Sequence, residues 1–160
     1  MEFQNDKNTK AFNFDGINCQ CRIIDITDGD TVKVIINFKN DYYKIIVRLN
    51  NIDTCETKSK CEENKNKGLD AKKRIYNLIT GKTIDIVDKK IIKNELNDNC
   101  YLCYIKCYDF DKYGRVLADI YSNEKSSDSF SSILINEKLA YTYGGKTKLT
   151  EKEQLELLSS

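Results

Sequence analysis

In two neighbouring segments of the chain every second side chain is apolar, and this pattern constrains the fold more than any other feature. Even positions are apolar in residues 32–38, and odd positions are apolar in residues 43–49. An apolar residue at every second position predicts a half-buried β-strand. The pair Asn40-Asp41 between the two segments tolerates tight-turn dihedrals, so we expect a β-hairpin. The alternation also places Arg48 on the face opposite the core, where we expect its side chain to be displayed.

Three later segments have the composition of strands. Residues 83–87, 101–108 and 116–121 are short runs rich in β-branched, aromatic or other apolar side chains. The charged residues 58–67 are expected to form a mobile surface loop, and residues 88–99 a charged connection.

Two segments space their apolar residues as a helix does, and a third has the capping residues that begin a helix. One apolar face is formed, at positions i, i+4, i+7 and i+8, by Ala71, Ile75, Leu78 and Ile79. Gly81 is a good stop for this helix. Residues 126–140 suggest a second helix, and residues 150–153, with the sequence T-E-K-E, form a capping box that opens a short terminal helix.

These elements predict one domain preceded by an arm. Residues 1–18 are polar and aperiodic, so we expect a flexible N-terminal arm, followed by a single domain over residues 19–160. Five or more short strands, with one helix after the third, favour an α+β, mainly β fold. The architecture that fits best is a five-stranded OB-fold barrel with two to three helices.

Composition restricts the available chemistry. The chain contains no histidine, which removes the commonest general base, the commonest zinc ligand and every serine or cysteine triad that uses histidine. Any catalysis must therefore rest on carboxylates, Lys, Tyr, Cys, Arg or a metal. The formal net charge is +1, so nucleic acid could be attracted only by a local cluster of cations.

The seven cysteines bear on the cellular compartment. Seven is an odd number and the first residues lack the pattern of a signal peptide, so we expect reduced thiols and an intracellular, cytoplasmic protein without a membrane segment. Cys100, Cys103 and Cys107 have a spacing that suggests zinc. Their segment has the composition of a strand, in which Cys103 and Cys107 would face one way and Cys100 the other, so the spacing favours a strand over a zinc knuckle.

Three short segments are unusually dense in polar side chains. They are D-G-D-T at residues 28–31, R-L-N-N-I-D-T-C-E-T at residues 48–57 and D-K-Y-G-R at residues 111–115. Each alone is consistent with a solvated turn, because Asp, Gly and Lys are common in turns. Together and in this order the three segments resemble the staphylococcal nuclease family, and the resemblance runs from about Cys21 to the C-terminus.

The resemblance implies an OB-fold nuclease that uses one Ca²⁺ ion and cuts DNA and RNA, with single strands preferred, leaving 3′-phosphate ends. It implies that the metal is held by the carboxylates of Asp30 and Asp53 and by the backbone carbonyl of Thr54. It further implies that Glu56 activates or orients water and that Arg48 and Arg115 grip the scissile phosphate. The neighbouring phosphate and base would be bound by Lys112, Tyr113 and one or both of Tyr141 and Tyr143.

The residue types suit these roles. Carboxylate and carbonyl oxygens are the hard ligands that Ca²⁺ prefers. Arginine matches two phosphate oxygens at once, and aromatic rings near the site favour unpaired bases. Cys55 stands where the family usually has proline, and we expect it to loosen the strand end.

The alternative class is a catalytically inactive nucleic-acid-binding OB module, in which the acidic and arginine residues would be replaced. They are all present here. No obligate protein partner is implied, and we expect a monomer.

Overall fold

The computed structural model describes residues 3–159, which form a closed barrel of five strands in the order β1-β2-β3-β6-β5. The strands are β1 (Asn18–Asp28), β2 (Thr31–Phe38), β3 (Asp41–Leu49), β5 (Leu102–Phe110) and β6 (Val116–Tyr121). A separate two-stranded sheet pairs β4 (Ile52–Asp53) with β7 (Tyr141–Thr142). The predicted OB-type barrel is confirmed.

The hairpin expected from the alternating pattern is present. Strands β2 and β3 pair antiparallel from Thr31 opposite Arg48 to Phe38 opposite Asp41. The turn residues are Lys39 and Asn40, with φ values of 52° and 66°, so the turn lies one residue earlier than expected. Both residues have backbone dihedrals in the left-handed region. A two-residue turn with such dihedrals matches the right-handed twist of the two strands that it joins.

The barrel is closed by a short parallel contact. Val47, Arg48 and Leu49 of β3 pair with Val116, Leu117 and Ala118 of β6. All other neighbouring strands of the barrel are antiparallel. This seam brings the end of β3 beside the start of β6, although the two strands are far apart in the sequence.

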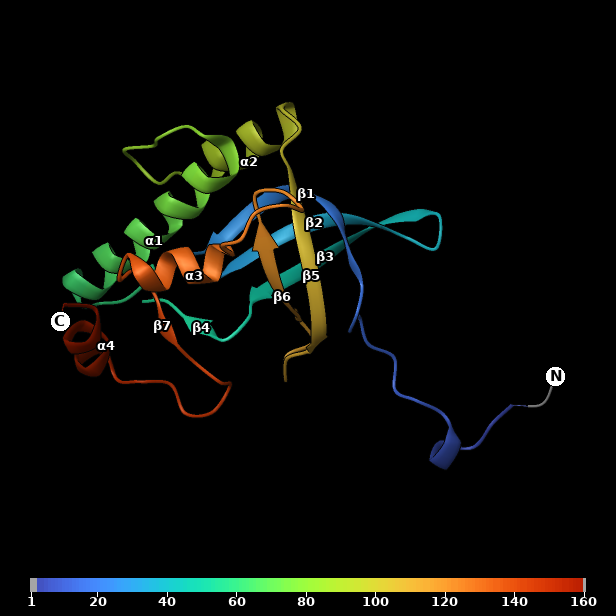
Figure 1. Cartoon of the computed structure of the whole chain (residues 1–160). Helices are drawn as coiled ribbons and strands as arrows, with labels where there is room; N and C mark the ends of the chain where they lie inside the picture. Colours follow the sequence, from blue (N-terminus) through green and yellow to red (C-terminus); the bar gives the residue numbers. More distant parts are fainter. Residues whose placement is uncertain (1–2, 160) are drawn as a thin grey trace.

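Four α-helices accompany the barrel, which is more than the two or three expected: α1 (Glu62–Thr80), α2 (Lys89–Asp98), α3 (Phe130–Asn136) and α4 (Glu151–Ser159). Figure 1 shows them gathered around one end of the barrel, away from the N-terminus. Helices α1 and α2 pack against β1, α3 packs against β6, and α4 contacts α1 and β7.

Several sequence-based boundaries were wrong. Residues 83–87 form no strand, and residues 88–99 are not a plain connection because they contain α2. The Asp88 side chain caps α2 by accepting from the Ile91 N–H, and the helix buries Ile92 and Leu96, four residues apart. Helix α1 starts at Glu62, inside the expected loop of residues 58–67.

The third and fourth helices differ in how well they were predicted. Helix α3 is confined to Phe130–Asn136, shorter than residues 126–140, because Ser129 caps its first turn by accepting from the Ser132 N–H. The capping box before α4 is confirmed. Thr150 N–H donates to Glu153 Oε2 at 2.8 Å, and Glu153 N–H donates to Thr150 Oγ1 at 3.2 Å.

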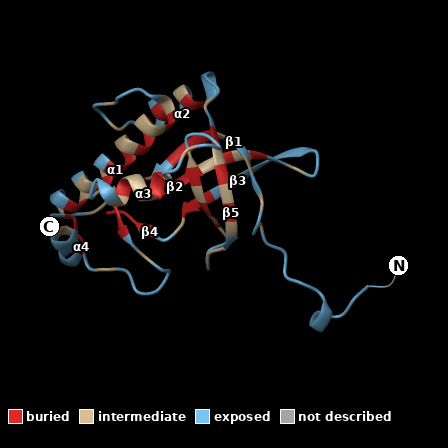
Figure 2. Ribbon diagram, viewed as in Figure 1, coloured by how far each residue is buried: buried red, intermediate tan, exposed pale blue. Residues whose placement is uncertain are grey.

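The core lies inside the barrel and beneath the helices, as the burial colours of Figure 2 show. Its largest fully buried side chains come from every layer and include Ile23, Ile75, Ile105, Phe130 and Leu134. The N-terminal segment is mostly exposed, but Phe14 packs against the core, with ring centroids 5.6 Å from both Phe38 and Phe110. The part of the arm next to β1 is therefore anchored by aromatic contacts.

None of the seven cysteines, all within the described residues, forms a disulfide. Cys103 and Cys107 lie on β5 and are buried, whereas Cys100 precedes the strand and is exposed, so the strand interpretation of this segment is confirmed. Among residues 3–159, no helix is long and apolar enough to cross a membrane.

Candidate active site

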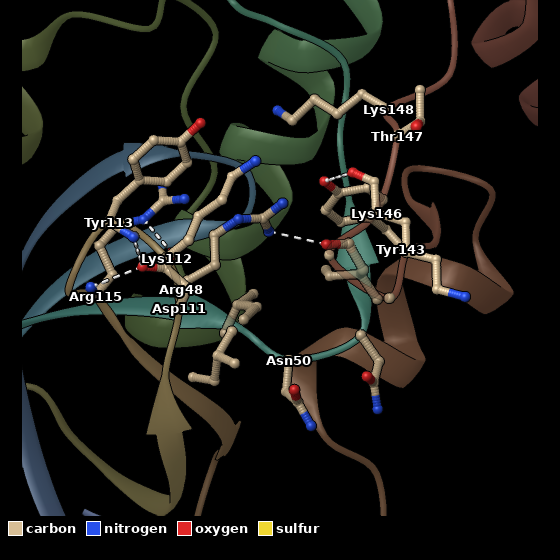
Figure 3. Close-up of a pocket in the computed structure, with 16 residues that line it drawn as sticks. Arg48, Asn50, Asp111, Lys112, Tyr113, Arg115, Tyr143, Lys146, Thr147 and Lys148 are labelled. Atoms are coloured by element: carbon tan, nitrogen blue, oxygen red, sulfur yellow. Dashed lines mark hydrogen bonds and ion pairs between the residues drawn. The ribbon is translucent and has the colours of Figure 1, made fainter. Parts of the chain in front are cut away.

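Four segments meet at one side of the barrel and surround a cavity of about 520 Å³. They are the end of β3 with the following turn, the β5–β6 loop (residues 111–115), strand β4, and the loop after β7 (residues 143–148). Figure 3 shows Arg48, Lys112, Tyr113 and Arg115 on one side and the loop after β7 opposite them. The second and third polar segments of the sequence thus meet at this cavity, and the first reaches it through the contact of Asp30 with Arg48.

The guanidinium of Arg48 lies between the two aspartates. Its Nη1 is 3.2 Å from Asp30 Oδ2 and donates to the Ile52 carbonyl at 2.9 Å, and its Nη2 is 3.0 Å from Asp53 Oδ1. Arg48 was expected to be displayed, but only 5% of it is exposed. It does point away from the barrel core, yet the aspartates and Tyr143, whose ring centroid is 5.9 Å from Cζ, cover it.

Asp30 is fixed by the segment that follows Asp53. Its Oδ2 accepts from the Thr54 N–H at 3.2 Å and from Thr54 Oγ1 at 3.1 Å, and its Oδ1 accepts from Thr31 Oγ1 at 2.9 Å. The turn between β1 and β2 and the segment after β4 therefore form one rigid acidic unit.

Asp53 is 1% exposed, and it is surrounded by three partners. The Tyr141 hydroxyl donates to Oδ2, and Arg48 and Lys148 lie near Oδ1. Burial raises the pKa of Asp53 and outweighs the Tyr141 hydrogen bond, and the nearby charge of Asp30 raises it further. Two buried carboxylates at close range repel each other unless a cation lies between them.

Two glycines allow α1 to approach this acidic unit. A Cβ on Gly29 would lie 2.6 Å from the Ala71 Cβ, and a Cβ on Gly68 would lie 2.5 Å from the Cys55 carbonyl oxygen. Gly29 was considered as a turn residue, but its left-handed freedom is not used, because it is absent from the positive-φ glycines of the described chain. Close packing explains both glycines.

Cys55 does not leave the strand end loose. Its side chain is 1% exposed and packs with Tyr141 and Leu158 of α4. The side chain of Asn64 in α1 lies beside its sulfur at 3.8 Å. The segment between Asp53 and Glu56 is consequently held from two helices.

Glu56 differs from the aspartates because its side chain is 62% exposed. The nearest cation is the Lys148 ammonium, at 3.6 Å from Oε1. An exposed carboxylate beside a buried acidic pair can reach a water molecule that approaches the same site.

Arg115 is oriented by Asp111. Arg115 Nε donates to Asp111 Oδ2 at 2.6 Å, and Asp111 Oδ1 accepts from the backbone N–H groups of Tyr113 and Arg115. Burial raises the pKa of Asp111, but these hydrogen bonds and the guanidinium outweigh it and hold the pKa below its usual value. The Nη atoms of Arg115 have no ion pair within residues 3–159.

The aromatic side chains separate into two kinds. Tyr113 is 72% exposed, and its ring lies under the Lys112 ammonium at 5.2 Å and the Arg115 guanidinium at 5.4 Å. Tyr143 lines the cavity, whereas Tyr141 is 3% exposed and bonded to Asp53. In this arrangement Tyr141 cannot stack on a base, so of the two candidates Tyr143 is available to a ligand.

The donor set at the acidic unit fits a hard cation. Two carboxylates, of Asp30 and Asp53, lie next to each other beside the backbone of Thr54, and cations already fill the space between and around them. No group of three or more acidic, histidine or cysteine side chains with metal-binding geometry occurs in the described chain. A metal here would accordingly depend on carbonyl and water oxygens in addition to two carboxylates, which is common for Ca²⁺.

Sequence reasoning missed the roles of Asp111, Tyr141 and Lys148. Asp111 was part of a recognised motif, and its partner Arg115 lies four residues away, so this ion pair had a signal. Lys148 had none, because a lysine in a polar loop is ordinarily solvated and only the fold brings it to Asp53. Burial of the lysine is unfavourable, but Asp53, Glu56 and Asp30 raise the pKa of Lys148.

Comparison with known proteins identifies the family of the chain. Residues 46–160 match the model of the family described as Staphylococcal nuclease homologue. The chain belongs to the staphylococcal nuclease family. The matched span begins within β3, so Asp30 lies before it, but the barrel places Asp30 against Arg48 and Thr54.

A curated relative from Bacillus subtilis (strain 168), named Endonuclease YncB, is 29% identical to this chain over 145 residues. The alignment covers 86% of this chain and 58% of the relative. The chain therefore spans little more than half the length of that protein.

Proposed function

We propose that this protein is a nuclease that hydrolyses phosphodiester bonds of DNA and RNA with Ca²⁺ as cofactor. The observation that carries the proposal is the acidic pair Asp30 and Asp53, joined through Arg48 to a cavity lined by further cations. Family membership and the printed name of the Bacillus relative support the same activity.

In the proposed mechanism Asp30, Asp53 and the Thr54 carbonyl hold one Ca²⁺ ion. When bound, the ion polarises a phosphate oxygen and helps to align the attacking water. A divalent cation there would take over part of the neutralisation that Arg48 now provides at 3.0–3.2 Å, which would free Arg48 to reach a phosphate.

Glu56 acts as the general base in a chain without histidine. Its exposure lets it accept a proton from water near the ion. Arg48 and Arg115 grip the scissile phosphate, and their planar forks gain hydrogen bonds as negative charge grows in the transition state. Asp111 fixes Arg115 through Nε, which directs the Nη atoms to the phosphate.

The cavity walls suit a single strand. Lys112 and Tyr113 lie on one side and Tyr143 on the other, so a phosphate and an unpaired base can be held together. Cleavage leaves a 3′-phosphate end in this proposal.

Digestion of single- and double-stranded DNA and RNA in Ca²⁺, Mg²⁺ or EGTA tests the proposal. We expect turnover with Ca²⁺, little with Mg²⁺, which holds its waters more tightly, and none in EGTA. Full activity with Mg²⁺ and EGTA would contradict the metal assignment. Nucleic-acid binding without cleavage in any metal would instead support the inactive OB module.

The matched variant is Glu56→Gln, which keeps size and removes the base. Turnover should fall by roughly 10²-fold or more, while Ca²⁺ binding followed by calorimetry persists. Asp30→Asn should lower both calcium affinity and activity. Near-normal turnover of Glu56→Gln would refute the assignment of the base.

A further inference from the structure

Lys148 lies at the site but outside the three polar segments recognised in the sequence, and the proposed mechanism gives it no role. Its Nζ lies 3.5 Å from Asp53 Oδ1 and 3.6 Å from Glu56 Oε1. We propose that Lys148 is a tethered counter-ion that holds the metal-binding carboxylates when Ca²⁺ is absent and moves to a substrate phosphate when Ca²⁺ is present. This inference rests on the proposed function and assigns Lys148 as a substrate-binding residue.

The charges around Asp53 favour such an exchange. Oδ1 of Asp53 is shared by Arg48, at 3.0 Å, and by Lys148, at 3.5 Å. A divalent ion on this buried carboxylate would place like charge beside the ammonium. Repulsion at such range is substantial where Asp53 is only 1% exposed. Calcium and the Lys148 ammonium therefore compete for one oxygen.

The position of Lys148 provides a second partner. The residue lines the same cavity as Arg48, Lys112 and Arg115, and Figure 3 shows its side chain pointing from the loop toward Arg48 and Lys112. A phosphate in that cavity would lie within reach of the flexible four-carbon stem. The ammonium can thus leave Asp53 and remain paired with an anion.

The backbone before Lys148 is suited to such movement. Gly144 and Gly145 precede it in a segment without helix or strand, and a Cβ added at either glycine would meet nothing within 4 Å. Half of the Lys148 side chain, 51%, is exposed. The backbone at the two glycines is therefore unobstructed, although a rearrangement would break the hydrogen bond from the Tyr143 hydroxyl to the Lys146 carbonyl.

The consequence is coupling between metal and substrate. A phosphate that attracts Lys148 removes the competitor of calcium, and calcium on Asp53 releases Lys148 to the phosphate. By linkage each ligand raises the affinity for the other by the same factor. Part of that factor depends on Lys148.

Calorimetry with Lys148→Met tests this inference. Calcium affinity of the free protein should rise roughly threefold to tenfold, because a competing cation is lost. The affinity for a nucleoside 3′,5′-bisphosphate in saturating Ca²⁺ should fall by about tenfold, because a charged phosphate contact is lost. A purely structural role would not shift the two affinities in opposite directions.

Two variants serve as controls. Lys152→Met removes an exposed lysine of α4 that lies outside the cavity lining and forms no ion pair within residues 3–159, and both affinities should stay within about twofold. Lys148→Arg keeps the charge and should restore wild-type calcium affinity. Thermal unfolding of each variant confirms that it is folded.

The outcomes separate the inference from the proposed function. Calcium affinity of Lys148→Met that is unchanged or weaker, with wild-type protein binding calcium normally, would overturn the inference alone. Wild-type protein that binds no calcium would overturn the metal assignment and the inference with it.

Discussion

The guanidinium of Arg48 neutralises two buried carboxylates of the site in the absence of a ligand. It contacts both aspartates and the Ile52 carbonyl, and little of it is exposed. Strand parity correctly placed it opposite the barrel core. The pattern could not show that Tyr143, from a loop nearly one hundred residues later, covers that face.

Replacing Arg48 by Lys retains the charge and removes the planar fork. An ammonium cannot bond Asp30, Asp53 and a phosphate with the same geometry. We expect kcat to drop by about 10²-fold while the affinity for a nucleoside bisphosphate changes less. Steady-state kinetics with calorimetry measures both, and a loss confined to KM would show that the fork contributes only to binding.

Replacing Asp111 by Asn tests whether the charge of Asp111, which orients Arg115, stabilises the fold in a pH-dependent way. The folded-state pKa of Asp111 is below its unfolded value of about 3.9. Its charge therefore stabilises the fold above about pH 4, and this contribution is lost as pH falls through the lower folded pKa. At pH 7, Asp111→Asn should cost roughly 1–2 kcal/mol.

Urea unfolding of wild-type and Asp111→Asn protein at pH 7 and pH 3 measures the difference, which should shrink at the lower pH. The exposed Asp128→Asn is the control and should change little at either pH. A difference of the same size at both values would contradict the argument.

At the scale of elements, α1 packs closely against the two segments that carry Asp30 and Asp53. Gly68 lies against the Cys55 carbonyl, and Ala71 against Gly29. One helix thus sets the distance between the two segments that carry Asp30 and Asp53. A shift of α1 would therefore change the distance between the two carboxylates.

Gly68→Ala tests this role of α1, because helix propensity and packing predict changes of opposite sign in the free energy of unfolding. In an exposed helix the change would stabilise by about 1 kcal/mol. Here the added methyl would lie 2.5 Å from a backbone oxygen, so we expect a loss of roughly 1–3 kcal/mol and weaker calcium binding. Urea unfolding and calorimetry measure these effects, with Asp70→Ala on the same helix as control. An increase in stability would show that the backbone yields easily.

Prediction from sequence succeeded where a regular spacing of apolar residues or a local capping motif defines the element. It failed where a short element depends on packing against another part of the fold. The hairpin, β6 and the capping box were identified because alternation or capping chemistry is local. Helix α2 was missed because its apolar side chains are few among charged residues, and its existence depends on packing against β1. The motifs supplied the proposed site residues, but not Lys148.

For the whole molecule, the cysteines report on global unfolding. Four are buried, Cys100 is exposed, and burial raises the pKa of Cys103 and Cys107 to about 12. Thiolates react and thiols do not. Alkylation at pH 8 should therefore modify Cys100 first and the buried cysteines only in denaturant.

Peptide mass spectrometry after timed alkylation measures the order. Early modification of Cys103 in native protein would mean that the strand β5 opens locally. Two or more disulfides in the unreduced protein would contradict the expectation of reduced thiols.

The parallel seam between β3 and β6 has a consequence for when the site comes into existence. Three residue pairs join the strands, and Arg48 is one of the six residues involved. A chain folded only through α2 has its acidic residues and Arg48, but neither the second arginine nor the loop with Lys148. The proposed phosphate grip, which needs Arg48 and Arg115 together, is complete only when β3 and β6 are paired. Under the proposed function, an incomplete chain would therefore carry the metal-binding residues without the pair of arginines that grips a phosphate.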